Sequence, residues 1–140
     1  SLLMVDVSHF MTINDRHGHQ VGDVVLADTA KGLREALRTA DVVARYGGEE
    51  FAIILPETDI TEATRAAERV RAAISACRFS GVSESVTVTV SVGVACMQPN
   101  EASDELVFRA DAALLDAKRG GRDRVTLASP PTDVAAAQAV

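Results

Sequence analysis

Two adjacent carboxylates, Glu49 and Glu50, carry the clearest suggestion of chemistry in this sequence. They follow the pair Gly47-Gly48, and an apolar run stands on each side of these four residues. This pattern predicts a β-hairpin with the glycine pair as its turn, because glycine adopts positive φ without a Cβ penalty and lets a ligand lie against the backbone. Like charges this close repel unless a cation stands between them, so both glutamates are candidate metal ligands.

The acidic balance of the chain limits the partners that it can have. The net charge is −6 and the pI is near 5.0, whereas a protein that binds the nucleic-acid backbone presents a basic face. We therefore expect no nucleic-acid partner, and small anionic ligands only where a metal ion or a local basic cluster holds them. The length of 140 residues suffices for one core, and 47% hydrophobic with 24% charged residues is typical of a soluble globular domain.

Neither a membrane span nor a disulfide framework is predicted. No apolar run approaches the roughly 20 residues that a membrane helix needs, so we expect no membrane insertion by this domain. Cys77 and Cys96 are far apart and lack the neighbours of a metal motif, which favours reduced, buried thiols. We expect a cytoplasmic location, either free or as the cytoplasmic part of a membrane-anchored protein. Because the sequence opens directly on an apolar run, we also expect a domain of a longer protein.

The elements that must position the hairpin begin with a strand at residues 2–7, an apolar run that carries Asp6 near its end. Residues 8–22 are rich in polar residues and glycine, so a short helix and a loop are expected there. The clearest alternation, with valines on one face and small polar residues on the other, lies at 86–94 and predicts a strand. The remaining connection and strand are expected at 80–85 and 124–127.

Apolar residues recur at helical spacing in three longer segments, at 23–37, 60–76 and 103–118. Ser103 or Asp104 is the expected N-cap of the third helix, because short polar side chains accept hydrogen bonds from the first N–H groups of a helix. Each helix has one apolar and one polar face, so each is expected to cover a sheet.

The resulting order is strand, helix, helix, strand, strand, helix, strand, helix, strand. It predicts an α/β (α+β) fold with a central, mostly antiparallel five-stranded sheet flanked by helices, the layout of ferredoxin-like palm domains. We assign this domain to residues 1–127. Residues 128–140 contain Pro130-Pro131 and an alanine run, and are expected to be a disordered tail or linker. In such a sheet Asp6 would lie beside the glutamate pair.

The segment Arg45-Tyr46-Gly47-Gly48-Glu49-Glu50-Phe51 resembles the GG(D/E)EF signature of the GGDEF-domain diguanylate cyclases. Blocks at 3–10, 13–23 and 110–122 are similar to other motifs of that family in the same order, and the resemblance extends over 2–127. It implies a palm domain that condenses two GTP molecules into cyclic di-GMP with release of pyrophosphate. It also implies a homodimer with one GTP per subunit, and an N-terminal regulatory domain in the full-length chain.

The resemblance implies a site for Mg²⁺ or Mn²⁺, made by the Asp6 carboxylate, the Val7 backbone carbonyl and Glu49. Hard cations prefer oxygen ligands, and Mg²⁺ commonly takes one or two carboxylates plus substrate phosphates. Glu49 and Glu50 are implied as catalytic residues, with Glu50 supporting either a second metal or deprotonation of the attacking 3′-hydroxyl. Taken alone, the two glutamates would be better explained as solvated surface charges.

Substrate-binding roles are implied for Phe10, Asn14, Asp23, Gly47, Gly48, Lys118 and Arg122. Asn14 and Asp23 would read guanine, whose N1–H and 2-amino groups donate to amide and carboxylate oxygens. Lys118 and Arg122 would neutralise the β- and γ-phosphates. The simpler alternatives are a turn at Asn14 and a helix cap at Asp23. For the two cations, the alternative is that they complement the dipole at a helix end.

A second ligand site is implied by Arg38-Thr39-Ala40-Asp41, an RxxD motif with five residues between Asp41 and Gly47. That spacing matches the family's product-inhibition site, and Arg69 matches a further arginine that can contact the same cyclic di-GMP. A bidentate arginine with a nearby acceptor suits a guanine edge and a phosphate. Because RxxD also arises by chance, an ordinary helix-end ion pair is the alternative.

Three positions depart from the family pattern: Met11 where lysine is usual, Ser8 in place of an acid, and Leu115 where tyrosine is typical. The cation missing at Met11 and the acid missing at Ser8 favour an alternative in which the domain turns over weakly and serves as a GTP or cyclic di-GMP binding and regulatory module. The intact glutamate pair favours the enzyme. A different palm-type cyclase or polymerase is disfavoured by the guanine-reading pair and by the acidic balance of the chain.

Overall fold

The computed structural model describes residues 1–79, 82 and 86–131. Its elements, in chain order, are β1 (Leu2–Val7), α1 (Phe10–His17), α2 (His19–Ala36), β2 (Val42–Arg45), β3 (Glu50–Ile54), α3 (Ile60–Ser75), β4 (Val90–Ala95), α4 (Ser103–Arg119) and β5 (Val125–Leu127). This order is the one predicted from the sequence. None of the described helices is both long and apolar enough to cross a membrane.

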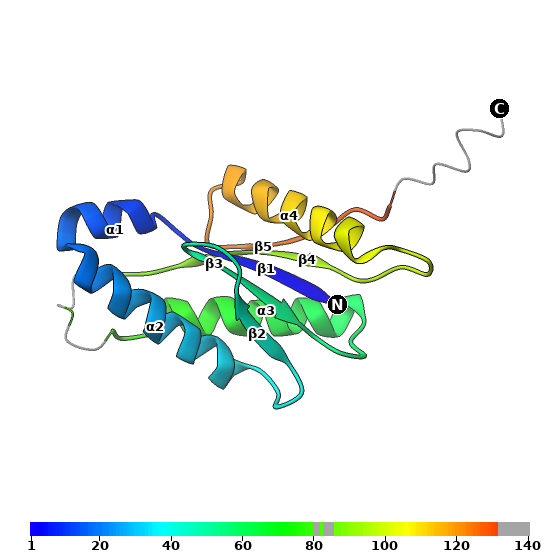
Figure 1. The fold of residues 1–140 in the computed structure, drawn as a ribbon, viewed down its shortest axis with the longest axis horizontal. Helices are drawn as coiled ribbons and strands as arrows, with labels where there is room; N and C mark the ends of the chain where they lie inside the picture. The colour runs from blue at the N-terminus through cyan, green and yellow to red at the C-terminus, as the bar shows by residue number, and fades with distance from the viewer. Residues whose placement is uncertain (80–81, 83–85, 132–140) are drawn as a thin grey trace.

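The strands form one five-stranded sheet in the order β2-β3-β1-β4-β5. All neighbouring strands are antiparallel except β4 and β5, which are parallel. The predicted, mostly antiparallel palm-like sheet is therefore confirmed. Figure 1 shows α4 on one face of the sheet and α2 and α3 on the other. Because β1 is the middle strand, a side chain near its end has neighbours from both adjacent strands.

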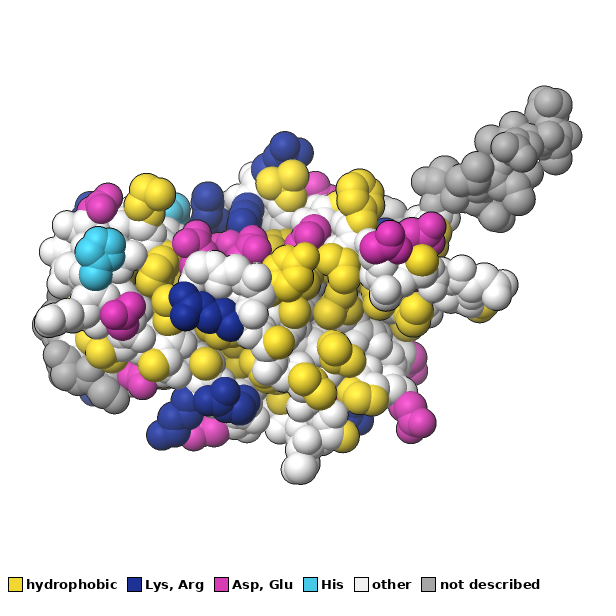
Figure 2. All heavy atoms as spheres, viewed as in Figure 1, with side chains coloured by type: hydrophobic (Ala, Val, Ile, Leu, Met, Phe, Trp, Pro, Cys, Tyr) yellow, Lys and Arg dark blue, Asp and Glu magenta, His cyan; other side chains and the backbone are white. Residues whose placement is uncertain are grey.

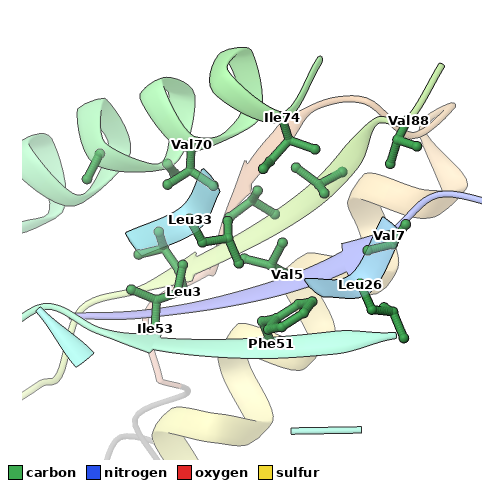
Figure 3. Packing of buried hydrophobic residues seen from close by; sticks show 14 of the residues in the cluster. Leu3, Val5, Val7, Leu26, Leu33, Phe51, Ile53, Val70, Ile74 and Val88 are labelled. Atoms are coloured by element: carbon green, nitrogen blue, oxygen red, sulfur yellow. The ribbon is translucent and has the colours of Figure 1, made fainter. Parts of the chain in front are cut away.

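Alternation along β1 divides the core into two parts. Leu3, Val5 and Val7 are fully buried in the larger cluster, where Figure 3 shows them packed with side chains from β3, α2 and α3. Met4 belongs to the smaller cluster under α4. Since residues two apart in a strand share a face, Asp6 points to the α4 side with Met4.

The position of α4 depends on Gly93 of β4. A methyl group at Gly93 would overlap the backbone of Ala110 and Leu114 in α4. This glycine therefore lets α4 lie directly on the sheet, and alanines supply much of the rest of the buried helix face. As a result, the last turn of α4 comes within contact distance of the end of β1.

The strand predicted at 86–94 is shorter than expected. β4 begins at Val90, although Val88 and Val90 are both buried in the larger cluster. Val90 pairs with Val7, the last residue of β1. The residues before Val90 therefore have no β1 residue opposite them, because the chain leaves the sheet for α1 after Val7. Alternation at 86–89 thus indicated burial correctly but did not indicate strand pairing.

The second helix begins earlier than predicted. α2 starts at His19 rather than near Asp23, because Gly18 takes a φ of 90° and separates α1 from α2 within a single residue. Asp23 therefore lies inside α2, and the alternative in which it caps this helix is wrong.

Two further local predictions are wrong. The N-cap of α4 is Ala102, one residue before Ser103, and the Glu105 carboxylate accepts a hydrogen bond from its N–H. A glutamate in the first turn of α4 therefore bonds to the start of the helix, where the sequence predicted a polar N-cap side chain. Cys77 and Cys96 are free thiols, but both are partly exposed rather than buried.

The first two residues of the predicted tail, Ala128 and Ser129, are bonded to the domain. The Ala128 N–H donates to Val94 O at 2.7 Å, and Arg109 Nη1 donates to Ser129 O at 3.1 Å. These bonds attach the beginning of the expected tail to β4 and α4. The expectations for 132–140 and for most of the connection at 80–85 lie outside the described residues.

Candidate active site

Asp6 is a buried carboxylate near the C-terminal end of the central strand. Lys118, from the last turn of α4, has its Nζ 2.9 Å from Asp6 Oδ2. Only 9% of the Asp6 side chain is exposed. An ionised carboxylate is tolerated at such a position because the charge-assisted contact with Lys118 compensates for lost hydration.

Glu50 stands directly opposite Asp6 across β1 and β3. Cross-strand partners point to the same face of a sheet, so two like charges meet on the α4 side. Lys118 Nζ also lies 3.9 Å from Glu50 Oε1, so one ammonium group is shared by carboxylates from two strands. Figure 2 shows acidic and basic side chains together where the C-terminal end of α4 lies above the β2–β3 hairpin.

The surroundings disfavour the ionised form of Glu50. Burial raises the pKa of Glu50, the negative charge of Asp6 raises it further, and Lys118 lowers it in part. Asp111 of α4 adds to this negative field, and burial raises its own pKa against the opposing effect of Lys118. Asp6, Glu50 and Asp111 thus form an acidic cluster for which Lys118 is the counter-ion.

The turn of the hairpin differs from the predicted two-residue turn. The connection runs from Tyr46 to Glu49, and neither Gly47 nor Gly48 has positive φ, so the conformational reason given for the glycine pair is wrong. The N–H groups of Tyr46 and Gly47 donate to Glu50 O at 2.8 and 3.2 Å and close the turn. A Cβ at Gly48 would meet nothing within 4 Å, so this stretch of backbone is open to a ligand.

Arg45 and Val7 fix the turn in place. Arg45 Nε donates to Gly47 O at 3.2 Å, and Arg45 Nη2 donates to Gly48 O at 2.7 Å. The Val7 N–H donates to Glu49 O at 3.1 Å and ties the turn to the end of β1. The backbone of Glu49 therefore lies beside the strand that carries Asp6.

The residues predicted to bind metal are only partly brought together. Glu50, rather than Glu49, faces Asp6, and within the described part of the chain the Glu49 side chain makes no hydrogen bond or ion pair. No three His, Cys, Asp or Glu side chains among the described residues are grouped as a metal site. Oxygens of Asp6 and Glu50 nevertheless surround one cation, Lys118 Nζ, so this position suits positive charge. Metal binding by Asp6, the Val7 carbonyl and Glu49 stays a prediction.

The two residues predicted to read guanine lie on α1 and α2. Asn14 Oδ1 is buried without a hydrogen-bond partner and packs against Gly22, where a methyl group would overlap it. The Phe10 ring lies against the same glycine. Asp23, the next residue, is exposed and lines a cleft of about 340 Å³ between α2 and the hairpin strands. Asn14 thus contacts the residue that directly precedes Asp23, and the amide and carboxylate oxygens of the two residues are hydrogen-bond acceptors.

The two predicted phosphate ligands have different settings. Lys118 is engaged by Asp6 and Glu50, whereas the Arg122 side chain makes no hydrogen bond or ion pair with the residues that the structure describes. Arg122 follows the end of α4 with a left-handed backbone, at a φ of 62°. Met11 is 74% exposed on α1, so a lysine at this position would be solvated.

The family model described as "Diguanylate cyclase, GGDEF domain" matches residues 1–124. The chain belongs to the GGDEF domain family. This GGDEF domain is 46% identical over 127 residues to diguanylate cyclase DgcP of Pseudomonas aeruginosa. The aligned region covers 91% of this chain and 19% of that protein. The chain spans about a third or less of the length of the curated relatives that it matches.

Solved structures give the same assignment. The crystal structure of diguanylate cyclase SiaD in complex with its activator SiaC, from Pseudomonas aeruginosa, has a TM-score of 0.86 and 43% identity over 91% of this chain and 49% of that chain. The GGDEF domain of DgcB from Caulobacter crescentus, in complex with c-di-GMP, has a TM-score of 0.83 and 38% identity over 90% of this chain and 75% of that chain. The predicted family and fold are confirmed.

In this GGDEF domain the three residues predicted for the product site converge. Arg38 Nη2 lies 3.0 Å from Asp41 Oδ1 and donates to Thr58 Oγ1 at 2.7 Å, while Arg69 Nε donates to Ala36 O at 2.6 Å. All three predicted residues line one cleft of about 480 Å³ at the C-terminal end of α2. The Asp41 side chain is 1% exposed but that of Arg38 is 57% exposed, so the guanidinium group remains accessible.

Sequence reasoning left two residues of the GGDEF site without a role. Asp111 stands seven residues before Lys118, a spacing that puts both on one helix face, and this signal could have added it to the acidic cluster. Arg45 offered no such signal, because its bonds to the turn carbonyls depend on a backbone conformation that is not visible in the sequence.

Proposed function

We propose that this GGDEF domain condenses two GTP molecules into cyclic di-GMP with release of pyrophosphate. The observation that carries the proposal is that the Asp6 and Glu50 carboxylates, from adjacent strands, converge on one cation position beside the open Gly47-Gly48 turn. Phosphoryl transfer depends mainly on positioning and on neutralising phosphate charge, which such a position can supply. The alignment with a named diguanylate cyclase over most of the chain supports the same reaction.

Guanine recognition is assigned to Asn14 and Asp23. The orphaned Asn14 Oδ1 accepts a hydrogen bond from the guanine 2-amino group, and the exposed Asp23 carboxylate accepts one from N1–H. Adenine lacks both donors and would leave these acceptors unpaired, so GTP is favoured over ATP.

The triphosphate is assigned to the backbone around Phe10 and the Gly47-Gly48 turn, with Lys118 and Arg122 neutralising the β- and γ-phosphates. The Arg122 side chain has no partner in the described part of the chain and is available for this role. Lys118 is bound to Asp6, so it can turn to the phosphates only when another cation takes its place at the carboxylates.

We assign a divalent cation, Mg²⁺ or Mn²⁺, to Asp6, the Val7 carbonyl and Glu49, next to the position where Asp6 and Glu50 already hold an ammonium group. Such an ion supplies Lewis acidity at the α-phosphate and makes the attacking 3′-hydroxyl easier to deprotonate. We assign the uptake of that proton to Glu50, whose raised pKa suits a group that accepts a proton during the reaction.

A homodimer follows from this chemistry, because one domain holds one GTP and the product contains two guanosine units. The relatives are much longer than this chain, and we assign control of the pairing to an N-terminal regulatory domain of a cytoplasmic protein. The cleft lined by Arg38, Asp41 and Arg69 is assigned to cyclic di-GMP, which would inhibit its own synthesis there.

Incubation of the purified full-length protein with GTP and Mg²⁺, followed by chromatography of the nucleotides, tests the proposal. Cyclic di-GMP and pyrophosphate are the expected products. Asp6→Asn and Glu50→Gln are expected to lower the rate at least about 100-fold with an unchanged circular dichroism spectrum. Asp104→Asn, which changes an exposed acid in the first turn of α4, at the other end of that helix from Lys118, is the matched control and should retain the rate. Tight nucleotide binding without product would contradict the proposal.

A further inference from the structure

The connection that follows α4 has a left-handed backbone at three consecutive residues. Gly121, Arg122 and Asp123 have φ values of 117°, 62° and 45°. Glycine adopts such values freely, but arginine and aspartate do so uncommonly, and a strained conformation persists only where surrounding contacts hold it. One of these two residues with an uncommon backbone conformation, Arg122, is assigned above to the GTP phosphates.

Backbone and side-chain bonds to neighbouring parts of the chain hold the connection on either side of Asp123. The Arg122 N–H donates to Ala117 O at 3.0 Å, which closes the end of α4. Arg124 Nε donates to Arg122 O at 3.1 Å, and the Arg124 guanidinium packs against the turn at Gly120 and Gly121. The bond to Ala117 attaches Arg122 to the buried face of α4, and the Val92 N–H of β4 donates to Arg124 O at 2.9 Å, so both ends of the connection are fixed. Neither bond holds Asp123, which lies between them.

A further contact, at Asp123 itself, comes from a distant helix. Arg71 Nη1 of α3 donates to Asp123 Oδ1 at 2.9 Å, and Arg71 Nε donates to Glu68 Oε2 at 3.0 Å. The Arg71 side chain is 26% exposed, and its hydrogen bonds to Glu68 and Asp123 raise its pKa. α3 itself is anchored by Val70 and Ile74, which are fully buried in the larger cluster. Asp123 is therefore attached through Arg71 to a rigid part of the core.

We propose that Arg71 is a positioning residue for the cyclase reaction: it holds Asp123, and through it the left-handed connection that presents Arg122 to the GTP phosphates. The proposal rests on the role assigned to Arg122. Without the Arg71–Asp123 pair, the connection could relax to ordinary backbone angles, and the direction of the Arg122 side chain would change with it. Arg71 itself touches neither substrate nor metal in this proposal.

Steady-state kinetics of the full-length protein test the proposal. Arg71→Gln and Asp123→Asn are each expected to raise the KM for GTP about threefold to tenfold, with kcat within about twofold of the unchanged protein. Arg65→Gln is the matched control, because Arg65 makes the same kind of pair with Glu62 on α3, at 2.9 Å, but has no contact with the connection. It should leave KM unchanged.

A double-variant comparison separates this proposal from the role of Arg122. If Arg71 acts through Arg122, Arg122→Ala raises KM, and adding Arg71→Gln to Arg122→Ala causes little further rise. An unchanged KM in Arg122→Ala would overturn the phosphate role of Arg122. Independent, multiplying effects of the two substitutions would overturn the positioning role of Arg71 and leave the phosphate role intact.

Hydrogen exchange without nucleotide gives a second readout. Amides of residues 120–124 are expected to exchange faster in Arg71→Gln than in Arg65→Gln, while amides of β1 and β4 stay protected. The reversed pair, Arg71→Asp with Asp123→Arg, should restore part of the protection and lower KM again. If Arg71→Gln does not fold, Asp123→Asn carries the test, because asparagine tolerates the left-handed backbone. Equal exchange in Asp123→Asn and the unchanged protein would overturn the proposal.

Discussion

At the scale of single residues, one strand pairing organises the acidic cluster. Asp6 and Glu50 are cross-strand partners, and like charges directly opposite each other destabilise an antiparallel pair. Lys118 offsets part of this repulsion because its Nζ reaches both carboxylates. The GGDEF domain thus keeps two acids at a position where neutral side chains would favour folding, which is typical of a functional site.

Glu50→Gln is expected to abolish synthesis and yet to raise the free energy of unfolding of the metal-free protein by about 0.2–1 kcal/mol, because it removes the charge opposite Asp6. Thermal unfolding at neutral pH with a chelator measures this gain. Glu49→Gln is the matched control, since this side chain is next in the chain but does not face Asp6, and its stability should be unchanged. An equal gain from Glu49→Gln would contradict the explanation.

At the scale of elements, the contact of α4 with β4 decides whether Lys118 reaches Asp6. The last turn of α4 carries Lys118, and the helix lies on the sheet at Gly93 without an intervening side chain. Moving the helix outward would move the counter-ion away from both carboxylates. The same helix carries Asp111, so its position also sets the field around Glu50.

Gly93→Ala is expected to lower the free energy of unfolding by about 1–3 kcal/mol and to reduce activity, because a methyl group there overlaps the backbone of α4. Urea unfolding and initial rates measure the two effects. Gly48→Ala is the matched control for stability, since its Cβ meets nothing within 4 Å and its φ is not positive. It should unfold like the unchanged protein but lose activity if substrate lies on the turn. A fully stable and active Gly93→Ala protein would refute the close approach of α4.

The hydrogen bonds of Arg109, in α4, predict that stability depends on pH. Arg109 Nε donates to Glu101 Oε1 at 2.6 Å and Arg109 Nη2 donates to Cys96 O at 2.7 Å, with the Arg109 and Glu101 side chains 11% and 2% exposed. The hydrogen bond from Arg109 lowers the pKa of Glu101 against the opposing effect of burial. The stability that this pair contributes is therefore present above the unfolded-state pKa, about 4.3, and is lost as the pH falls through the folded-state value.

Glu101→Gln is expected to cost about 3 kcal/mol of unfolding free energy at neutral pH, because it leaves the buried Arg109 charge without its partner. Urea unfolding between neutral pH and about pH 3 should show the difference from the unchanged protein shrinking as the solution becomes acidic. Parallel pH profiles for the two proteins would show that Glu101 titrates in the same way when folded and unfolded.

At the scale of the whole molecule, the hairpin strands connect the two proposed nucleotide sites. Glu50 at the start of β3 belongs to the acidic cluster, and Leu55, just after β3, lines the cleft of Arg38, Asp41 and Arg69. A ligand in that cleft would therefore contact the opposite end of β2 and β3 from the turn at residues 46–49. This continuity would give the proposed product inhibition a physical route through β2 and β3.

Arg38→Ala is expected to relieve product inhibition, raising the inhibitory concentration of cyclic di-GMP about tenfold or more, while the initial rate stays close to that of the unchanged protein. The reason is that Arg38 is an exposed donor in the product cleft and lies outside the acidic cluster. Initial rates with added cyclic di-GMP measure both quantities, and Arg65→Ala on α3 is the control. Unchanged inhibition in Arg38→Ala would refute the product site.

Local patterns account for what could be predicted. The order of elements follows from periods of 2 and 3.6 residues, and it is confirmed. The same patterns misplaced the starts of β4 and α2, because the end of a neighbouring strand and the φ of a single glycine set those boundaries. Neighbouring residues in the sequence also did not predict the four-residue hairpin connection or the hydrogen bonds from Arg45 to it.

By itself, the sequence determined the family, the palm-like order of elements and the set of candidate site residues, because motif and period are properties of neighbouring residues. Only the tertiary structure decided which charges meet: that Glu50 rather than Glu49 faces Asp6, that Lys118 and Asp111 join them, and that Arg71 pairs with Asp123. Such pairings depend on strand register and on how closely a helix can approach a sheet, and both are settled by packing between distant parts of the chain.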